Sequence, residues 1–295
     1  MDGSELEALA AGVPHLSIDE ILAHPRFPAA RKVYVERHLA IYGRDPFLTR
    51  LLIESGRFVV NKVALVLHAA QDMSRPETWL TIGRLKREMA MFGLTGGRQI
   101  DHLVARLRAV GFLDLDIPDG DRRLRILKPT EKMLAHDRDW LRIYHESLAL
   151  LCPQNDYGPA LRRDRAFQVA HGRVALRLLP LSAKAFATLP EMMLFFNRAA
   201  GHMVITALVH AALADPGRRH APVDFGELGE RFGVSRTHVR GLLVAAQRAA
   251  LVRLRARGGH SVEILPRLWA GYDRGMATGL SLHDLVYAVT TARRA

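Results

Sequence analysis

A run of arginines in the last third of the chain could bind a polyanion. Six arginines and no acidic residue lie between Val234 and His260. Arginine neutralises phosphate groups, and its guanidinium can also pair with the O6 and N7 atoms of guanine. The run therefore indicates a surface that faces duplex DNA, and the alternative is a helix face that is simply solvated.

The residues around this run have the pattern of a helix-turn-helix. Phe225, Leu228 and Phe232 recur at helical spacing and predict a first helix. Gly233 then supplies a turn, and Ser235 is a suitable N-cap for a second helix. In this motif the second helix enters the major groove of DNA.

The predicted second helix has one apolar face and one polar, basic face. Val239, Leu242 and Leu243 share the apolar face, which should pack inward. Alternating residues around Gly258-Gly259 then predict a β-hairpin, or wing. The residues that we expect to contact DNA are Arg236, Thr237, His238, Arg240 and Arg248 on the helix, and Arg253, Arg255 and Arg257 on the wing.

The same order of elements is predicted once more, earlier in the chain. Phe92-Gly93-Leu94 forms the turn, Thr95 is the expected N-cap, and Pro118-Asp119-Gly120 joins two strands. Asp101 would repel phosphate unless it accepts from a cytosine amino group or pairs with an arginine. The expected DNA contacts are Arg98, Asp101, His102 and Arg108 on the helix, and Arg122, Arg123 and Arg125 on the wing.

An ungapped alignment of the two copies indicates an internal repeat. When the turn at Phe92-Gly93-Leu94 is placed on Phe232-Gly233-Val234, Leu103-Val104-Ala105 falls on Leu243-Val244-Ala245. Three further matches keep the same order and shift only slightly, as loops would allow. They are Leu67-His68-Ala69-Ala70 with Val209-His210-Ala211-Ala212, Ile126-Leu127 with Ile264-Leu265, and Asp137-Arg138 with Asp273-Arg274. The sequence therefore predicts two winged-helix units in one chain.

The alignment pairs unlike residues in the two second helices. A symmetric dimer reads a palindrome because its two helices are identical, so this chain should read two unlike half-sites about one helical turn apart. The paired residues are Gly97 with Thr237, Arg98 with His238, and Asp101 with Gly241.

The first wing also resembles a known family. Asp121-Arg122-Arg123, followed by Thr130-Glu131-Lys132, resembles the wing and following helix of the MarR family of bacterial transcription regulators. Pro129 stands where that family usually has Leu, and Met133 where it usually has Gly. Asp121 and Arg123 could instead form an ion pair that stiffens the hairpin. MarR proteins usually carry one copy per chain and dimerise, so the resemblance implies a dimer fused into one polypeptide, with a hub that can host a small-molecule effector.

The composition favours a DNA-binding protein over an enzyme. The formal net charge is +12 and the isoelectric point is near 10.5, which suits a polyanion binder. Cys152 is the only cysteine, which excludes an intramolecular disulfide and a multi-cysteine zinc site; burial is a simpler role for it than redox sensing. The histidines form no tight ligand cluster, and His68 and His210 look like core or interface residues. We expect no catalytic activity, metal or cofactor.

The sequence also bears on the compartment. The N-terminus begins acidic and lacks a long apolar core, so no signal peptide is expected. The most apolar segment, Met192 to Ala214, contains Asn197, Arg198 and His202 and predicts a buried helix, not a membrane span. These features indicate a cytoplasmic, nucleoid-associated protein.

The predicted fold is mainly α with small β-hairpin wings, a tandem winged helix-turn-helix pseudo-dimer around a helical hub. We expect a disordered segment at 1–16, a first domain at 17–152 and a second at 153–295. Long helices around 40–70, 132–151 and 160–214 should form the hub. Further expected features are a capping box at Ser17, a helix from Pro46 to Ala70 that Gly56 can bend or interrupt, and a new helix capped by Ser281.

The sequence favours a sequence-specific regulator of transcription that binds double-stranded DNA as a monomeric pseudo-dimer. Two alternatives remain: a plasmid replication initiator that binds repeated origin sequences, and a chromosome-organising adaptor whose helix faces bind protein. The arginine-rich second copy counts against the adaptor, since a protein-binding face would usually show apolar patches.

Overall fold

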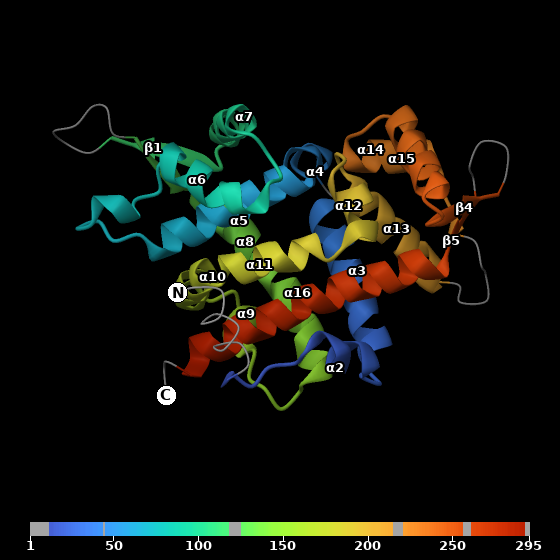
Figure 1. Cartoon of the computed structure of the whole chain (residues 1–295), viewed down its shortest axis with the longest axis horizontal. Helices are drawn as coiled ribbons and strands as arrows, with labels where there is room; N and C mark the ends of the chain where they lie inside the picture. The colour runs from blue at the N-terminus through green and yellow to red at the C-terminus, as the bar shows by residue number, and fades with distance from the viewer. Residues whose placement is uncertain (1–11, 44, 118–124, 215–220, 256–260, 293–295) are drawn as a thin grey trace.

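The computed structural model describes residues 12–43, 45–117, 125–214, 221–255 and 261–292 (Figure 1). Within them the protein is mainly helical, with two small antiparallel sheets. The first half contains α2 (Ile18–Ala23), α3 (Phe27–Tyr42), α4 (Pro46–Leu52), α5 (Ser55–Ala70), η1 (Pro76–Thr78), α6 (Ile82–Met89), η2 (Ala90–Phe92), α7 (Gly97–Ala109), β1 (Leu113–Asp116), β2 (Ile126–Pro129) and α8 (Glu131–Leu151). The second half contains α9 (Gly158–Leu161), α10 (Arg165–Arg177), α11 (Leu179–Ala187), α12 (Pro190–Phe196), α13 (Gly201–Ala214), β3 (Ala221–Pro222), α14 (Phe225–Phe232), α15 (Arg236–Arg248), β4 (Val252–Leu254), β5 (Ser261–Ile264) and α16 (Pro266–Ala292).

Helices from both halves interleave in a central hub, which we define as α3, α5, α8, α10, α13 and α16. Helix α3 packs against α8 and α13, α5 packs against α10, and α16 crosses α8 and α10. One hydrophobic cluster includes buried residues from each of these helices. In Figure 1, α16 runs across the middle of the view, with α6 and α7 above one end and α14 and α15 above the other. The predicted domain division at 153 stays a prediction, because this core is shared.

Local capping signals account for several helix starts. The Ser17 hydroxyl accepts from the Glu20 amide, and the Glu20 carboxylate accepts from the Ser17 amide, so the predicted capping box is confirmed. Pro46 occupies the first turn of α4, where its missing N–H costs no hydrogen bond, and Asp45 caps that helix. Residues 12–16, expected to be disordered, lie in the described part, and the Leu16 amide donates to Asp284 (2.8 Å).

Helix breaks are less well predicted. The expected helix from Pro46 to Ala70 is interrupted, but before Gly56, because Glu54 is extended between α4 and α5. The expected break before Ser281 is absent, because Ser281 is buried inside the continuous helix α16. There Asp284 accepts a hydrogen bond from Tyr157 (2.7 Å) as well as from the N-terminal segment, so it serves tertiary contacts and not a helix cap.

The apolar stretch from Met192 to Ala214 is also broken, into α12 and α13. Ala200 adopts a positive φ of 58°, and its amide donates to the Ile53 carbonyl (2.8 Å). Among the described residues, no single helix has the length and hydropathy to cross a membrane. Helices α12 and α13 reach that length only together, and they are bent by 113°.

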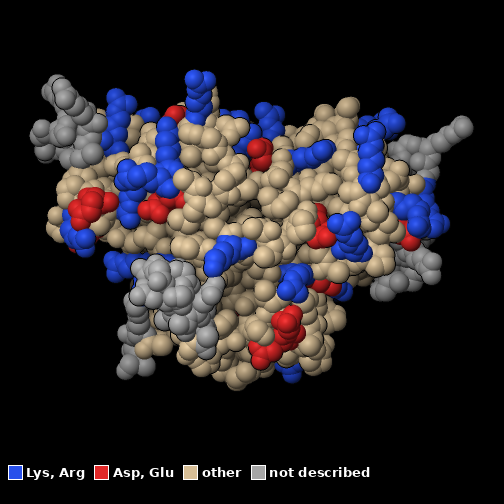
Figure 2. All heavy atoms as spheres, viewed as in Figure 1, with Lys and Arg blue, Asp and Glu red and all other residues tan. Residues whose placement is uncertain are grey.

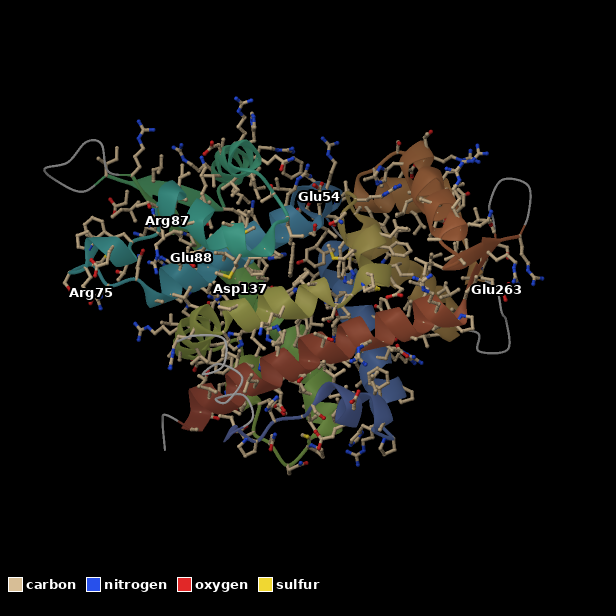
Figure 3. The ribbon with its side chains drawn as sticks, in the orientation of Figure 1. Glu54, Arg75, Arg87, Glu88, Asp137 and Glu263 are labelled. Carbon is tan, nitrogen blue, oxygen red and sulfur yellow. The ribbon has the colours of Figure 1, made fainter. Side chains whose placement is uncertain are left out.

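The hub buries charged and polar side chains as well as apolar ones. The Lys62 ammonium lies 2.7 Å from an Asp137 carboxylate oxygen, and Gln168 donates to the other oxygen at 2.7 Å. Burial alone would raise the pKa of Asp137, but the charge and hydrogen bond of Lys62 lower it. Asp137 lies near the centre of the molecule (Figure 3). A buried pair of this kind is stable only because the remaining acceptor positions are also bonded.

Several hub histidines are neutral because they are buried. Burial lowers the pKa of His38 and His145 to about 4, and that of His171 and His202 to about 3. The His145 Nδ1 atom lies 2.8 Å from the Leu141 carbonyl oxygen. The predicted core histidines differ from these: His68 is half-buried, and His210 is exposed on α13.

We expect the free energy of unfolding to fall when the pH falls from 7.5 to 5.5. The unfolded chain takes up protons near pH 6.5, whereas the folded histidines stay neutral down to about pH 4. Each such histidine should therefore cost about 1 kcal/mol of stability over this interval. Urea unfolding at several pH values measures the slope, and His145→Phe should reduce it by one proton, whereas His210→Gln is the exposed control. A stability that does not change between pH 7.5 and 5.5 would contradict the prediction.

Candidate nucleic-acid interface

Two parts of the chain share one order of helices and strands. The N-terminal unit consists of α6, α7, β1 and β2, and the C-terminal unit consists of β3, α14, α15, β4 and β5. In the C-terminal unit, β3 comes before the two helices in the chain and pairs with β5, so it belongs to the same sheet as the hairpin. In the N-terminal unit, Thr81 comes just before the first helix and forms a single β-bridge with Ile126 of β2, at the position that β3 has in the other unit. Both units lie along the upper edge of the view in Figure 1, with their hairpins toward opposite ends.

The second helices of the two units correspond residue for residue, but one position away from the ungapped alignment. Both α7 and α15 have 13 residues. Their last turns close by equivalent bonds, from the Phe112 amide to Leu107 and from the Leu251 amide to Ala246. The buried positions are Ile100, Leu103, Val104 and Leu107 in α7 and Val239, Leu242, Leu243 and Ala246 in α15.

The aligned register is wrong by one position because the two turns differ in length. Gly93 and Gly233 both adopt positive φ, at 62° and 69°, as the turn requires. The cap of α7 is Gly96 and not Thr95, because the Gln99 side chain accepts from the Gly96 amide (3.0 Å). The N-terminal unit therefore has an additional residue between its turn glycine and its second helix. Ser235 caps α15 as predicted.

The corrected register changes the paired residues. Asp101 corresponds to Arg240, and Arg98 corresponds to Thr237. The two units still differ in side chains, as the sequence predicted. They carry opposite charges at one equivalent helix position.

The match downstream of the hairpins is displaced as well. Helices α8 and α16 begin at equivalent places, because the Thr130 amide bonds to Phe112 and the Leu265 amide bonds to Leu251. These bonds make Thr130 equivalent to Leu265. Eight residues further on, Asp273 of α16 is therefore equivalent to Arg138 and not to Asp137. The similarity between the units therefore rests on the order of their helices and strands and on which positions are buried, and not on the matched Asp-Arg pairs.

Most of the predicted contact residues of α15 form an exposed face. Arg236, Thr237 and Arg240 are exposed near its start, and Arg248 is exposed at its end. His238 does not belong to this face. It is half-buried, and its Nε2 atom lies 2.9 Å from the Ala199 carbonyl oxygen, so its ring is directed toward the segment before α13.

The exposed face of α7 carries an internal ion pair. Arg98, His102 and Arg108 are exposed as expected. Asp101 pairs with Lys86 of α6, whose Nζ atom lies 2.7 Å from the carboxylate. The sequence left open how Asp101 would be neutralised, and Lys86 was not foreseen, because that contact forms only once α6 and α7 pack across the turn.

The arginines of the C-terminal hairpin also have acidic partners. Arg253 pairs with Glu263 at 2.6 Å, and Arg255 approaches the same carboxylate at 3.3 Å. Glu263 belongs to β5, at that end of the molecule (Figure 3). Arg125, next to β2, is exposed. Arg122, Arg123 and Arg257, together with the suggested Asp121–Arg123 pair, lie outside the described residues.

Basic side chains project along the edge on which both units lie (Figure 2). Glu54 lies near this edge, between α7 and α14 (Figure 3).

No family model, curated protein or solved structure matches the chain. Among the described residues, no group of three or more His, Cys, Asp or Glu side chains is arranged to hold a metal ion. Cys152 is buried at the end of α8, and burial raises its pKa.

The turn glycines should differ in their tolerance of a side chain. At Gly93 a Cβ atom would meet no other atom within 4 Å, so Gly93→Ala should cost only the left-handed backbone, about 1 kcal/mol. At Gly233 a Cβ would overlap the Pro46 carbonyl oxygen, so Gly233→Ala should cost about 3 kcal/mol or more. Chemical unfolding of the two variants measures the difference. Equal losses would contradict the packing of the C-terminal turn against α4.

Proposed function

We propose that the protein is a sequence-specific regulator of transcription that binds double-stranded DNA through two unlike winged helix-turn-helix units. The observation that carries the proposal is the repeated order of helix, turn, helix and hairpin, preceded by a single bridge in one unit and a short strand in the other, with an exposed polar and basic second helix in each unit. This is the order in which winged-helix proteins place a recognition helix in the major groove and a wing beside it. In this respect the chain is similar to a MarR-type dimer fused into one polypeptide.

The placement of the two units supports one DNA duplex as the partner. Both second helices lie on the same edge of the molecule (Figure 1). The hub holds them there, since α5 packs against α6 and α7, and α13 packs against α14 and α15. A single chain therefore presents two reading heads, as a dimer would, and acts as a monomeric pseudo-dimer. As a DNA-bound regulator it belongs with the nucleoid in the cytoplasm.

Charge distinguishes the two proposed reading heads. Arg236, Arg240 and Arg248 of α15 take part in no ion pair among the described residues. Free guanidinium groups suit phosphate and guanine. On α7 the equivalent of Arg240 is Asp101, which Lys86 already pairs. An aspartate at this position can accept from a cytosine amino group only if it exchanges or shares that partner. The two heads should therefore differ in both affinity and base preference.

The proposed base contact of Arg240 can be tested by Arg240→Ala. Its loss should weaken binding to the cognate site by about 1–3 kcal/mol and relax the preference at one base pair. Competition binding on the selected site and on random duplex measures both effects. Arg274→Ala is the matched control, because Arg274 is exposed on α16 beside Asp19, away from both units.

The random duplex decides which contact Arg240 makes. A guanine contact predicts a large loss on the cognate site and a small loss on random DNA. Equal losses on both would make Arg240 a phosphate contact. No loss on either would remove α15 from the interface and count against the proposed function.

The target site should have two unlike halves about one helical turn apart. Selection from a random duplex library, followed by hydroxyl-radical footprinting, gives the sequence and the protected positions. Two protected major-groove segments with different sequences are expected. A perfect palindrome, or protection of one segment only, would contradict the asymmetric pair of heads.

A further inference from the structure

The hub encloses a cavity of about 670 Å³. Helices α5, α8, α10 and α16 surround it, and α11 and α12 cover it on another side. The lining is mainly apolar and includes aromatic rings such as Trp140 and Phe186. Met73 and Val169 belong to the lining and are exposed, which marks where the cavity reaches the surface. A volume of this size matches sites that enclose a small organic molecule.

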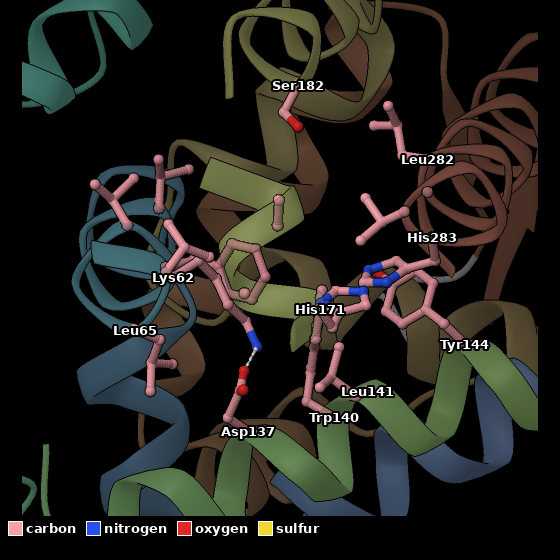
Figure 4. A pocket seen from close by; sticks show the side chains of 18 of the residues that line it. Lys62, Leu65, Asp137, Trp140, Leu141, Tyr144, His171, Ser182, Leu282 and His283 are labelled. Carbon is pink, nitrogen blue, oxygen red and sulfur yellow. Dashed lines mark hydrogen bonds and ion pairs between the residues drawn. The ribbon is translucent and has the colours of Figure 1, made fainter. Parts of the chain in front are cut away.

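Two imidazole rings form a polar patch within this apolar lining. His171 of α10 and His283 of α16 lie with their planes within 14° of parallel and their centroids 5.5 Å apart. The Tyr144 ring lies beside them, with its centroid 4.1 Å from that of His283 (Figure 4). The Nε2 atom of His171 and the Nδ1 atom of His283 are buried, and neither has a hydrogen-bond partner among the described residues.

Unpaired ring nitrogens are costly in such surroundings. A buried polar atom without a partner loses its bonds to water and gains nothing in return. Each neutral imidazole offers one donor and one acceptor nitrogen, so together the rings can bond to a hydroxyl or a carbonyl group. The His171 and His283 rings therefore carry unused hydrogen-bonding groups in the wall of the cavity.

The buried Lys62–Asp137 pair is balanced without any ligand. Across the cavity from the two imidazoles, Lys62 points at Asp137 (Figure 4). Asp137 also accepts from Gln168, and the Lys62 ammonium lies 3.3 Å from the centre of the Trp140 ring. Both charges are therefore compensated. A carboxylate or ammonium ligand would bury a charge that no side chain of this pair is free to neutralise.

We propose that this cavity binds an uncharged, largely apolar molecule that contains a ring and carries one or two hydroxyl or carbonyl groups, which bond to His171 and His283. The aromatic lining accepts the ring by stacking and edge contacts. The site stands on the hub alone and does not depend on DNA binding.

Three probes of similar shape distinguish the contributions of the apolar ring, the neutral polar group and a charge to binding by the full-length protein. The probes are 1-naphthol, which has a neutral hydroxyl, naphthalene, which has no polar group, and 1-naphthoate, which is charged. Equilibrium dialysis should show saturable binding of 1-naphthol, about tenfold tighter than that of naphthalene. The carboxylate should bind most weakly. No saturable binding by any probe, or tightest binding by 1-naphthoate, would overturn the proposal.

Ring substitutions locate the polar contact. His171→Phe and His283→Phe keep the ring volume but remove the nitrogens, so they should lower the affinity for 1-naphthol about tenfold and leave that for naphthalene unchanged. His210→Phe is the control, because His210 is exposed and lies outside the cavity lining. Unchanged 1-naphthol binding in both cavity variants would also overturn the proposal. If a variant fails to fold, the ranking of the three probes on the unaltered protein still decides the outcome.

Discussion

The shared hydrophobic core of the hub is the constraint on which the rest of the structure depends. Helices from the two halves of the chain bury their apolar faces against one another, α5 on α10 and α3 on α8 and α13. Neither half could keep its helices in place without the other, because each would expose the face that its partner covers. Since α5 and α13 belong to the hub and also support the two units, the core that stabilises the fold also fixes the separation of the helices that we propose as reading heads.

The same core is incompletely packed at its centre, which is unusual because protein interiors are generally as dense as organic crystals. The polar groups there fall into two classes. Lys62 and Asp137 satisfy one another, whereas His171 and His283 keep unpaired nitrogens. Helix α5 lines this cavity and also packs against α6 and α7. Helix α5 therefore lies between the cavity and the N-terminal unit.

Helix caps and turns could be predicted from the sequence, whereas contacts between residues distant in sequence could not. The capping box at Ser17 and the turn glycines Gly93 and Gly233 appear as predicted, since each depends on only a few neighbouring residues. The helix break at Ala200 depends on a bond to Ile53, which is remote in sequence. The shared order of elements was predicted, but the alignment was one position out in the second helices, because an ungapped comparison cannot reveal an additional residue in a turn. Burial periodicity would have shown it, since the inward positions of α7 and α15 agree only after that shift.

The corrected register strengthens the case for functional asymmetry. In the ungapped alignment Asp101 stands opposite a glycine, which is a modest difference. In the structure it stands opposite Arg240, so equivalent positions on two exposed helices carry opposite charges. A homodimer cannot hold such a difference, because every substitution appears in both subunits. A fused chain can, since each unit changes alone while the shared hub keeps their spacing. The Lys86–Asp101 pair has no counterpart at Arg240 among the described residues, so under the proposed function the C-terminal unit supplies more of the attraction to phosphate and the N-terminal unit supplies a different base preference.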